Sequence, residues 1–164
     1  MPIVLTSNEK ILSGHDWKDI QGEQYHYPNQ YRNLISLGTR FVYYRGIHRI
    51  TGGPGEMEYT GTGEIGEVWL DPDTEDFPKG KQNWYCSIVN FIPFPDPVLA
   101  KTGEETIETV EHPQNHWRRA VRFLPDEQLN EILSRARLFD ALEGQRISRK
   151  KIVQAIEEEA NPEL

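Results

Sequence analysis

The segment Met57–Leu70 limits the possible folds more than any other part of this 164-residue chain. It reads MEYTGTGEIGEVWL, with Gly61 and Gly63 set among aromatic and β-branched residues. Such a composition favours a β-strand, and glycine inside a strand marks a bend or a bulge. We therefore expect one long strand with glycine bends, of the kind that closes a small barrel.

Three further segments have the composition of strands. They are PIVLT at residues 2–6, FVYY at residues 41–44 and WYCSIVNFIPF at residues 84–94. Prolines cannot donate a ladder hydrogen bond, so Pro93, Pro95 and Pro97 are expected to end the last of these strands. Residues 115–122 predict either a final strand or a turn into one.

Apolar residues at helical spacing predict three helices. One begins at Pro28, continues to Ile35 and ends at Gly38, another follows Pro125, and a third covers residues 148–160. Residues 13–24 are polar and predict a loop. The fold class is therefore α+β, a small bent β-barrel flanked by helices. The barrel domain is expected over residues 1–123, with a C-terminal helical extension over residues 124–164.

The charge balance argues against a protein that coats nucleic acid without specificity. Lys and Arg total 18 and Asp and Glu total 26, which gives a net charge of −8, whereas nonspecific affinity requires neutralisation of phosphates. Between Tyr25 and Ile50, however, the chain has four arginines and no acidic residue. A local basic patch on an acidic molecule is what a nucleic-acid site requires.

The chain has no apolar run that could span a bilayer and no secretory leader pattern at its start, so no membrane partner is expected. Cys86 is the only cysteine, which excludes an internal disulfide and fits a reducing compartment. We therefore expect a cytoplasmic protein. Because Cys86 lies in the middle of a predicted strand, we expect a buried, inert thiol.

No catalytic motif is present in the sequence. It has no phosphate-binding GxxxxGK[ST] loop and no GxSxG elbow, and GTGEIG at residues 61–66 lies in a strand-like segment without the strand–turn–helix context of a dinucleotide site. His112 and His116 have the spacing of a metal pair, but Pro113 opposes a helical arrangement of them. No cofactor, metal site or catalytic residue is predicted, and the chain is more consistent with a binding protein than with an enzyme.

Aromatic and basic side chains are concentrated between Tyr25 and Arg45, in YHYPNQYRN and FVYYRG. On a strand, Phe41, Tyr43 and Arg45 share one face and Tyr44 lies on the other. If one face fills the core, the opposite face or the strand end can hold a flat heterocycle, and stacking of this kind contributes about 1–3 kcal/mol per base. The alternative is that these tyrosines only pack the interior of a sheet.

Three segments of the sequence resemble a known group of domains. They are GEQYHYPNQYRNLISLGTRFVYYRG, YTGTGEIGEVW and NHWRRAVRFLPDEQLNEIL. They resemble EVE-like domains of the PUA superfamily, which are relatives of YTH and SRA domains and occur in modification-dependent restriction proteins, often ahead of an HNH nuclease. The resemblance covers residues 12–135.

This resemblance implies a bent barrel that flips a modified base, such as 5-methylcytosine, 5-hydroxymethylcytosine or N6-methyladenine, into an aromatic cage. On this chain the expected base-binding residues are Trp17, Tyr25, His26, Tyr27, Tyr44 and Trp84. The expected phosphate-binding residues are Arg32, Arg45 and Arg49. No HNH pattern follows Leu133, so cleavage by this chain alone is not expected.

The leading prediction is a noncatalytic DNA-binding module that reads a modified base in restriction or defence against foreign DNA, with a nuclease or other effector as its partner. Three alternatives stay open at this point. The chain could be an RNA-binding PUA-like module, or an interaction protein that assembles through its C-terminal helices and has no nucleic-acid site. The third is a small enzyme in which His26 supplies acid–base chemistry.

Overall fold

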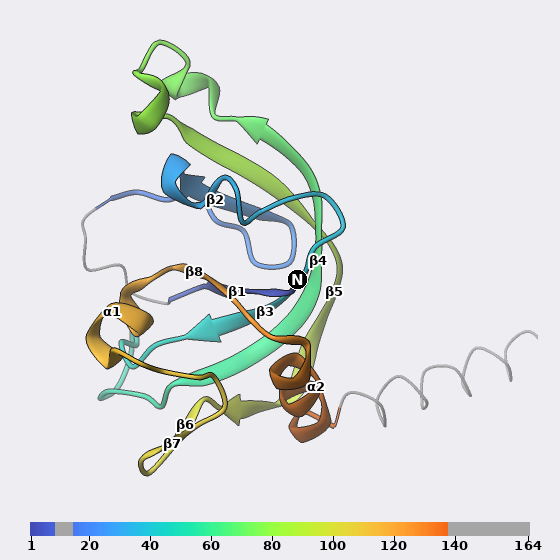
Figure 1. Cartoon of the computed structure of the whole chain (residues 1–164). Helices are drawn as coiled ribbons and strands as arrows, with labels where there is room; N and C mark the ends of the chain where they lie inside the picture. Colours follow the sequence, from blue (N-terminus) through green and yellow to red (C-terminus); the bar gives the residue numbers. More distant parts are fainter. Residues whose placement is uncertain (9–14, 138–164) are drawn as a thin grey trace, which may run out of the picture.

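The computed structural model describes residues 1–8 and 15–137 and has a mixed α+β fold (Figure 1). Its main element is a six-stranded sheet with the order β2-β5-β4-β3-β1-β8. The sheet curls into a half-barrel, so that its edge strands β2 and β8 lie on either side of an opening. The strands of this sheet are β1 (Ile3–Thr6), β2 (Gln24–Pro28), β3 (Arg40–Arg45), β4 (Glu58–Leu70), β5 (Asn83–Leu99) and β8 (Val121–Phe123).

The remaining elements are short. Strands β6 (Lys101–Thr102) and β7 (Glu105–Thr106) form a separate pair, and three 3-10 turns, η1 (Asn29–Tyr31), η2 (Pro72–Thr74) and η3 (Lys79–Lys81), lie in connections. The helices are α1 (Pro113–Arg118) and α2 (Asp126–Arg135). The helix predicted over residues 148–160 lies outside the described residues. No described helix has the length and apolar character needed to cross a membrane.

The prediction of a long, bent strand at residues 57–70 is confirmed. Strand β4 pairs with β5 along most of its length, and the register shifts between Tyr59 and Gly61, between Thr62 and Glu64, and again further along. Such irregularities bend a strand and increase its twist. Glycine is required by close packing, because a Cβ at Gly63 would lie 2.9 Å from Cζ of Phe41.

Strand β5 does not end at its prolines, so that part of the prediction is wrong. It continues through Pro93, Pro95 and Pro97 to Leu99. Strand β2 pairs only with residues 83–87 of β5, so among the described residues the rest of β5 has β4 as its one neighbour. Prolines at alternate positions remove N–H groups along the same edge of a strand, and an edge without a partner tolerates this loss.

Two predictions of local structure near the opening also need correction. Instead of starting a helix, Pro28 ends β2 with an extended backbone, and only the single turn η1 follows. The apolar spacing there has another cause, because Tyr31, Leu34 and Ile35 pack into the interior of the half-barrel. Residues 115–122 form the end of α1 and the start of β8, and Pro113 begins that helix, where a missing N–H is tolerated.

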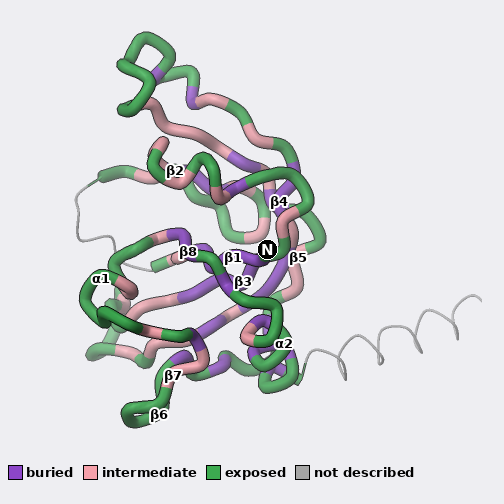
Figure 2. Tube along the Cα trace, in the orientation of Figure 1, coloured by how far each residue is buried: buried purple, intermediate pink, exposed green. Residues whose placement is uncertain are grey.

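Both faces of the central strands are buried (Figure 2). Phe41 and Tyr43 of β3 face the cluster inside the curl, while Val42 and Tyr44 face a second cluster on the outside. The opposite face of this strand is therefore not free, since α2 covers it with Leu129, Ile132 and Leu133. The end of the strand, the other alternative, does reach a cavity at Tyr44. The helix that opens the predicted C-terminal extension thus shares a core with β1 and β3.

A buried carboxylate fixes the segment that leads from β7 to β8. Glu108 accepts two hydrogen bonds from Arg122, from Nε and Nη2 at 2.9 Å each, and one from the hydroxyl of Tyr59. Its Oε1 lies 3.1 Å from Nε2 of His116 on α1. Burial alone would raise the pKa of Glu108, but the hydrogen bonds from His116, Arg122 and Tyr59 outweigh it and lower the pKa to about 2.

We predict that Glu108→Gln lowers the free energy of unfolding by about 3 kcal/mol, because it leaves the Arg122 charge buried without its counter-charge. Urea denaturation at pH 7 measures the loss. Glu131→Gln, which breaks only the exposed pair with Arg135, is the matched control and should cost under about 0.5 kcal/mol. Since the folded pKa of Glu108 is depressed, its stabilisation is present above pH 4.5 and is lost as the pH falls toward 2. Equal stability of the two variants would contradict this role.

Candidate functional site

A cavity of about 900 Å³ lies in the opening of the half-barrel. Its walls come from several parts of the chain. They are the end of β1, the segment 15–19, strand β2, the turn η1, the end of β3 with residues 46–48, Met57, and the end of α1. These parts surround an open space, because the edge strands β2 and β8 do not pair with each other. The volume is within the range of small-molecule sites, about 300–1,000 Å³. We call this space the first cavity.

Aromatic rings of two kinds line the first cavity. Trp17, Tyr31 and Trp117 are partly exposed and present ring surface to it. Tyr25, His26, Tyr27 and Tyr44 also line it but are buried, with exposed fractions of 6% or less. Trp117 stacks on Tyr44 with ring centroids 5.3 Å apart and an angle of 22° between planes. A planar ligand therefore meets the partly exposed rings, and the buried ring of Tyr44 supports that of Trp117.

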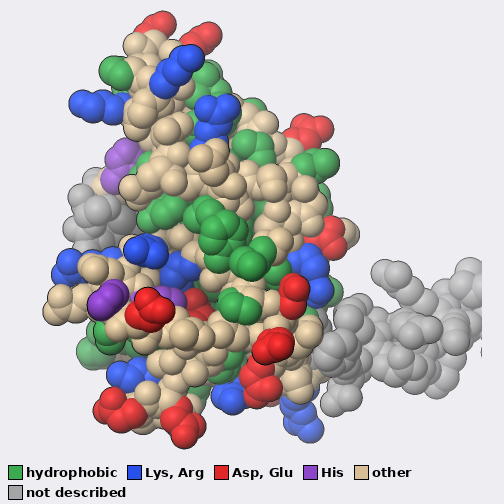
Figure 3. Space-filling model, in the orientation of Figure 1, with side chains coloured by type: hydrophobic (Ala, Val, Ile, Leu, Met, Phe, Trp, Pro, Cys, Tyr) green, Lys and Arg blue, Asp and Glu red, His purple; other side chains and the backbone are tan. Residues whose placement is uncertain are grey.

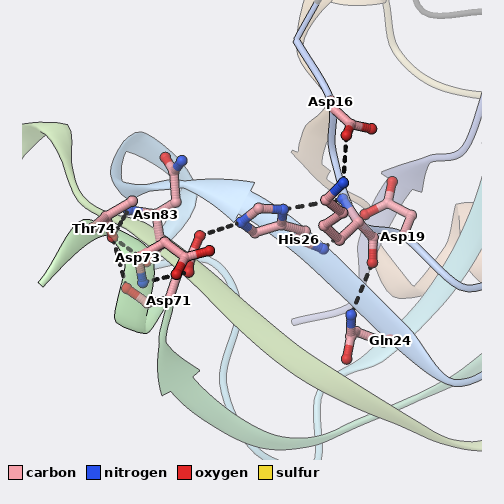
Figure 4. A network of polar contacts seen from close by, with 9 residues as sticks. Asp16, Asp19, Gln24, His26, Asp71, Asp73, Thr74 and Asn83 are labelled. Carbon is pink, nitrogen blue, oxygen red and sulfur yellow. Dashed lines mark hydrogen bonds and ion pairs between the residues drawn. The ribbon is translucent and has the colours of Figure 1, made fainter.

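His26 connects β2 to the wall segment 15–19 through a chain of hydrogen bonds (Figure 4). Its Nδ1 accepts from the backbone N–H of Lys18 at 3.1 Å, and its Nε2 lies 2.8 Å from Oδ2 of Asp71. Because Nδ1 is an acceptor, Nε2 carries the proton and donates to Asp71. Both ring nitrogens are thus occupied, which leaves His26 no role as an acid–base catalyst in this conformation.

The ring of His26 is also enclosed by aromatic neighbours. Tyr85 stacks on it with centroids 4.1 Å apart and planes 6° apart, and Trp17 meets it edge-on at 4.9 Å. Burial lowers the pKa of His26 below its ordinary 6.5, and the bond to Asp71 only partly opposes this shift. A neutral His26 therefore holds Trp17 at the cavity wall.

Among the described residues, Asp19 is the one carboxylate that lines the first cavity. Its Oδ1 accepts the backbone N–H of His26 at 2.7 Å, and no described residue donates to Oδ2. The side chain is open to solvent on the cavity side, yet the surrounding protein desolvates it and raises its pKa to about 6. A carboxylate that retains a free oxygen in a cavity is suited to accept a hydrogen bond from a ligand.

Two buried hydroxyl groups of cavity-lining residues lack a hydrogen-bond partner within the described part of the chain. They are the phenol of Tyr27 and Oγ1 of Thr6. Burial raises the pKa of Tyr27, so its hydroxyl stays protonated and remains a donor. Because an unpaired buried polar group costs about 1–3 kcal/mol, a ligand atom that bonded either hydroxyl would recover part of that energy.

The structure brings five of the predicted site residues to this cavity: Trp17, Tyr25, His26, Tyr27 and Tyr44. It does not bring Trp84 there. The indole N–H of Trp84 donates to Oδ1 of Asn29 at 3.2 Å, and the guanidinium of Arg32 lies 4.3 Å from its ring centroid. Trp84, which lies opposite Tyr27 in the β2–β5 register, therefore forms a contact with Arg32 outside the lining of the first cavity.

Arg45 and Arg49 do not line the first cavity either. Both donate to Oε1 of Glu58, at 2.6 and 2.9 Å, and Arg49 also bonds the carbonyl oxygens of Gly46 and Glu56. The sequence shows these arginines without an acid nearby in the chain, whereas folding brings Glu58 of β4 against them. Their charges are thus partly neutralised.

Several residues at the cavity escaped the sequence prediction. Asp19 lies in a predicted loop, Tyr31 in a predicted helix, and Trp117 and Arg118 in a segment predicted as a strand or turn. Arg118 is exposed and has no acidic partner among the described residues. The run Trp117-Arg118-Arg119 was the available signal, since it joins an aromatic ring to two cations.

The structure also shows where Cys86 and the GTGEIG segment lie. Cys86 is fully buried, as predicted, and burial raises its pKa to about 12. GTGEIG lies inside β4, where it serves strand packing. No group of three or more side chains suited to metal binding occurs within residues 1–8 and 15–137.

Comparisons with protein-family models, with curated proteins and with solved structures found no match.

We predict that His26 is the Nε2-protonated tautomer at pH 7 and titrates below pH 6.5. Long-range ¹H–¹⁵N spectra give the tautomer, and a pH series gives the pKa. Because the folded pKa is lowered, the stability that neutral His26 contributes is complete above pH 6.5 and is lost as the pH falls through the folded value. An Nδ1-protonated ring, or a titration above pH 6.5, would contradict the hydrogen-bond assignment.

Proposed function

We propose that this protein is a noncatalytic reader of a modified base in DNA, and that the first cavity holds one extruded nucleobase. The observation that carries the proposal is the combination of partly exposed Trp17, Tyr31 and Trp117 with the free oxygen of Asp19 in one cavity. The resemblance to EVE-like domains of the PUA superfamily supports it, and the curled half-barrel is compatible with such a fold.

The aromatic walls account for binding of a flat, uncharged ring. A base leaving a duplex loses its stacking and pairing, at a cost of a few kcal/mol. Stacking on protein rings contributes about 1–3 kcal/mol per base, so two walls suffice to offset the loss. Trp17 and Trp117 come from opposite sides of the opening, one before β2 and the other before β8.

Asp19 accounts for recognition of the base edge. Carboxylates accept hydrogen bonds from the exocyclic amino group of cytosine, and adenine carries a similar donor. Thymine has no amino group, so Asp19 favours a base that carries one, and among such bases the resemblance to EVE-like domains selects a modified cytosine or adenine. The apolar rings around it are suited to contact an added methyl group.

The proposal assigns no reaction to this chain. His26 has both ring nitrogens bonded and Cys86 is a buried thiol with a raised pKa, so neither is available as a base or nucleophile. A reader without its own chemistry requires an effector to act on foreign DNA, and a nuclease is the partner that the resemblance suggests. Phosphate contacts are assigned to the exposed Arg118 in preference to Arg45 and Arg49.

We predict that Trp17→Ala weakens binding of a DNA strand carrying one modified base by about tenfold, because one stacking wall is lost. Fluorescence anisotropy with modified and unmodified strands, and with a matched RNA, measures affinity and preference. Phe77→Ala is the control, since Phe77 is 50% exposed and does not line the cavity. Equal affinity for modified and unmodified strands would contradict a modification reader, and a requirement for the 2′-hydroxyl would identify RNA as the ligand.

A second prediction concerns pH. Since the pKa of Asp19 is raised to about 6, its carboxylate accepts from a ligand above that pH and is protonated below it. Affinity for the modified strand should therefore fall by about tenfold between pH 7 and pH 5. Asp19→Asn should bind weakly at both pH values, while Asp16→Asn, in the same segment but exposed and paired with Lys18, should behave like the parent protein. If Asp19→Asn binds the modified strand with the same pH dependence as the parent protein, Asp19 does not contact the ligand.

A further inference from the structure

A second cavity adjoins the first and shares part of its wall. It has a volume of about 780 Å³ and lies along α1 and the edge strand β8. Gln30 and Tyr31 line both cavities, so they form the boundary between them. The consecutive residues Arg118 and Arg119 line the first and the second cavity, respectively. The two spaces are therefore neighbours linked by a pair of arginines.

The second cavity offers cationic groups and one exposed ring. Arg119 and His112 are exposed, and neither has an acidic partner among the described residues. Phe123 of β8 is 55% exposed and lines the same space. Figure 3 shows this face of the molecule, where Lys or Arg side chains and histidines gather near α1 beside a hydrophobic area. An exposed aromatic ring and an unpaired guanidinium in the lining of one cavity are the groups that a nucleotide requires, one for its base face and one for its phosphate.

One of the two carboxylates in the described lining of the second cavity is already paired. Glu108 is buried and already bonded to Arg122, His116 and Tyr59. Glu111 is exposed and is the remaining acid of the lining. The amide side chains Asn115 and Gln128 add further polar groups without charge. The positive charge for a phosphate therefore comes from the consecutive pair Arg118 and Arg119 at the boundary of the two cavities, with Glu111 as the one free carboxylate in the described lining of the second cavity.

We propose that the second cavity is a subsite for the nucleotide adjacent to the extruded base. In this arrangement the phosphodiester between the two nucleotides passes Arg118 and Arg119, and the second base stacks on Phe123. The proposal rests on the proposed function, because it places the first base in the first cavity. It extends that function, because the ligand becomes a strand of at least two adjacent nucleotides. Neither base is paired with a complementary strand when it is bound.

The test compares a nucleoside with a strand. The probes are 5-methyl-2′-deoxycytidine and a single-stranded hexanucleotide carrying one 5-methylcytosine, with N6-methyladenine versions of both in parallel. Calorimetry measures the nucleosides, and anisotropy measures the hexanucleotides between 50 and 200 mM salt. The variants are Arg119→Gln and Phe123→Ala, both at exposed side chains. The control is Arg40→Gln, an exposed arginine that lines neither cavity.

We expect both variants to bind the hexanucleotide about tenfold more weakly than the parent protein and to bind the nucleoside equally well. Arg119→Gln should also reduce the slope of log affinity against log salt by about 0.7, the value for one contact to a single strand. Arg40→Gln should change neither quantity. If nucleoside binding persists and both variants bind the hexanucleotide like the parent protein, the second subsite is wrong while the first cavity stands. If no probe binds, both proposals are overturned.

Discussion

Across the opening of the half-barrel, tyrosine hydroxyl groups take the place of a strand pairing and connect β2 and the turn η1 to the end of β1 and the residue before β8. The hydroxyl of Tyr25 on β2 donates to the carbonyl of Thr6 at 3.0 Å, and the hydroxyl of Tyr31 accepts the N–H of Ala120 at 3.1 Å. A direct ladder would bring the strands to about 4.8 Å and close the barrel. A phenol spans a wider gap and still satisfies the backbone groups at the strand ends. The first cavity exists in the space that these longer connections leave.

The same connections explain why the chain uses so many tyrosines in one region. Each buried ring fills interior volume while its hydroxyl reaches a backbone group at the rim, a combination that phenylalanine cannot provide. Tyr43 follows the same pattern, since its hydroxyl accepts the N–H of Gly22 at 3.1 Å. The two interpretations of the aromatic cluster are therefore not exclusive. The buried tyrosines are structural, and Trp17, Tyr31 and Trp117 supply the accessible ring surface.

Local sequence predicted β1, β3, β4 and the first part of β5, because the signals of these strands are local. The aromatic and β-branched composition at residues 41–44 and the glycines Gly61 and Gly63 act within one segment, and both features appear in β3 and β4. Strand β2, which lines the cavity, was not predicted. The course of β5 past its prolines was missed because it depends on which neighbour each edge has. The pairing of Arg45 and Arg49 with Glu58 depends on a partner from another strand, as does the arrival of Trp117 beside Tyr44. The residue types in the sequence therefore indicated an aromatic site, whereas the residues that line the cavity could be identified only from the fold.

Recognition in the proposed site depends on a residue that a ligand need not touch. His26 holds segment 15–19 twice, by accepting the N–H of Lys18 at its ring and by donating its own backbone N–H to Asp19. These bonds position Trp17, which would stack on a base, and Asp19, which would read its edge. Asp71 in turn fixes the tautomer that makes the ring an acceptor. The charge states that support binding, neutral His26 and ionised Asp19, coexist at neutral pH and are both lost on acidification, since protonation of either group removes an acceptor from the same wall.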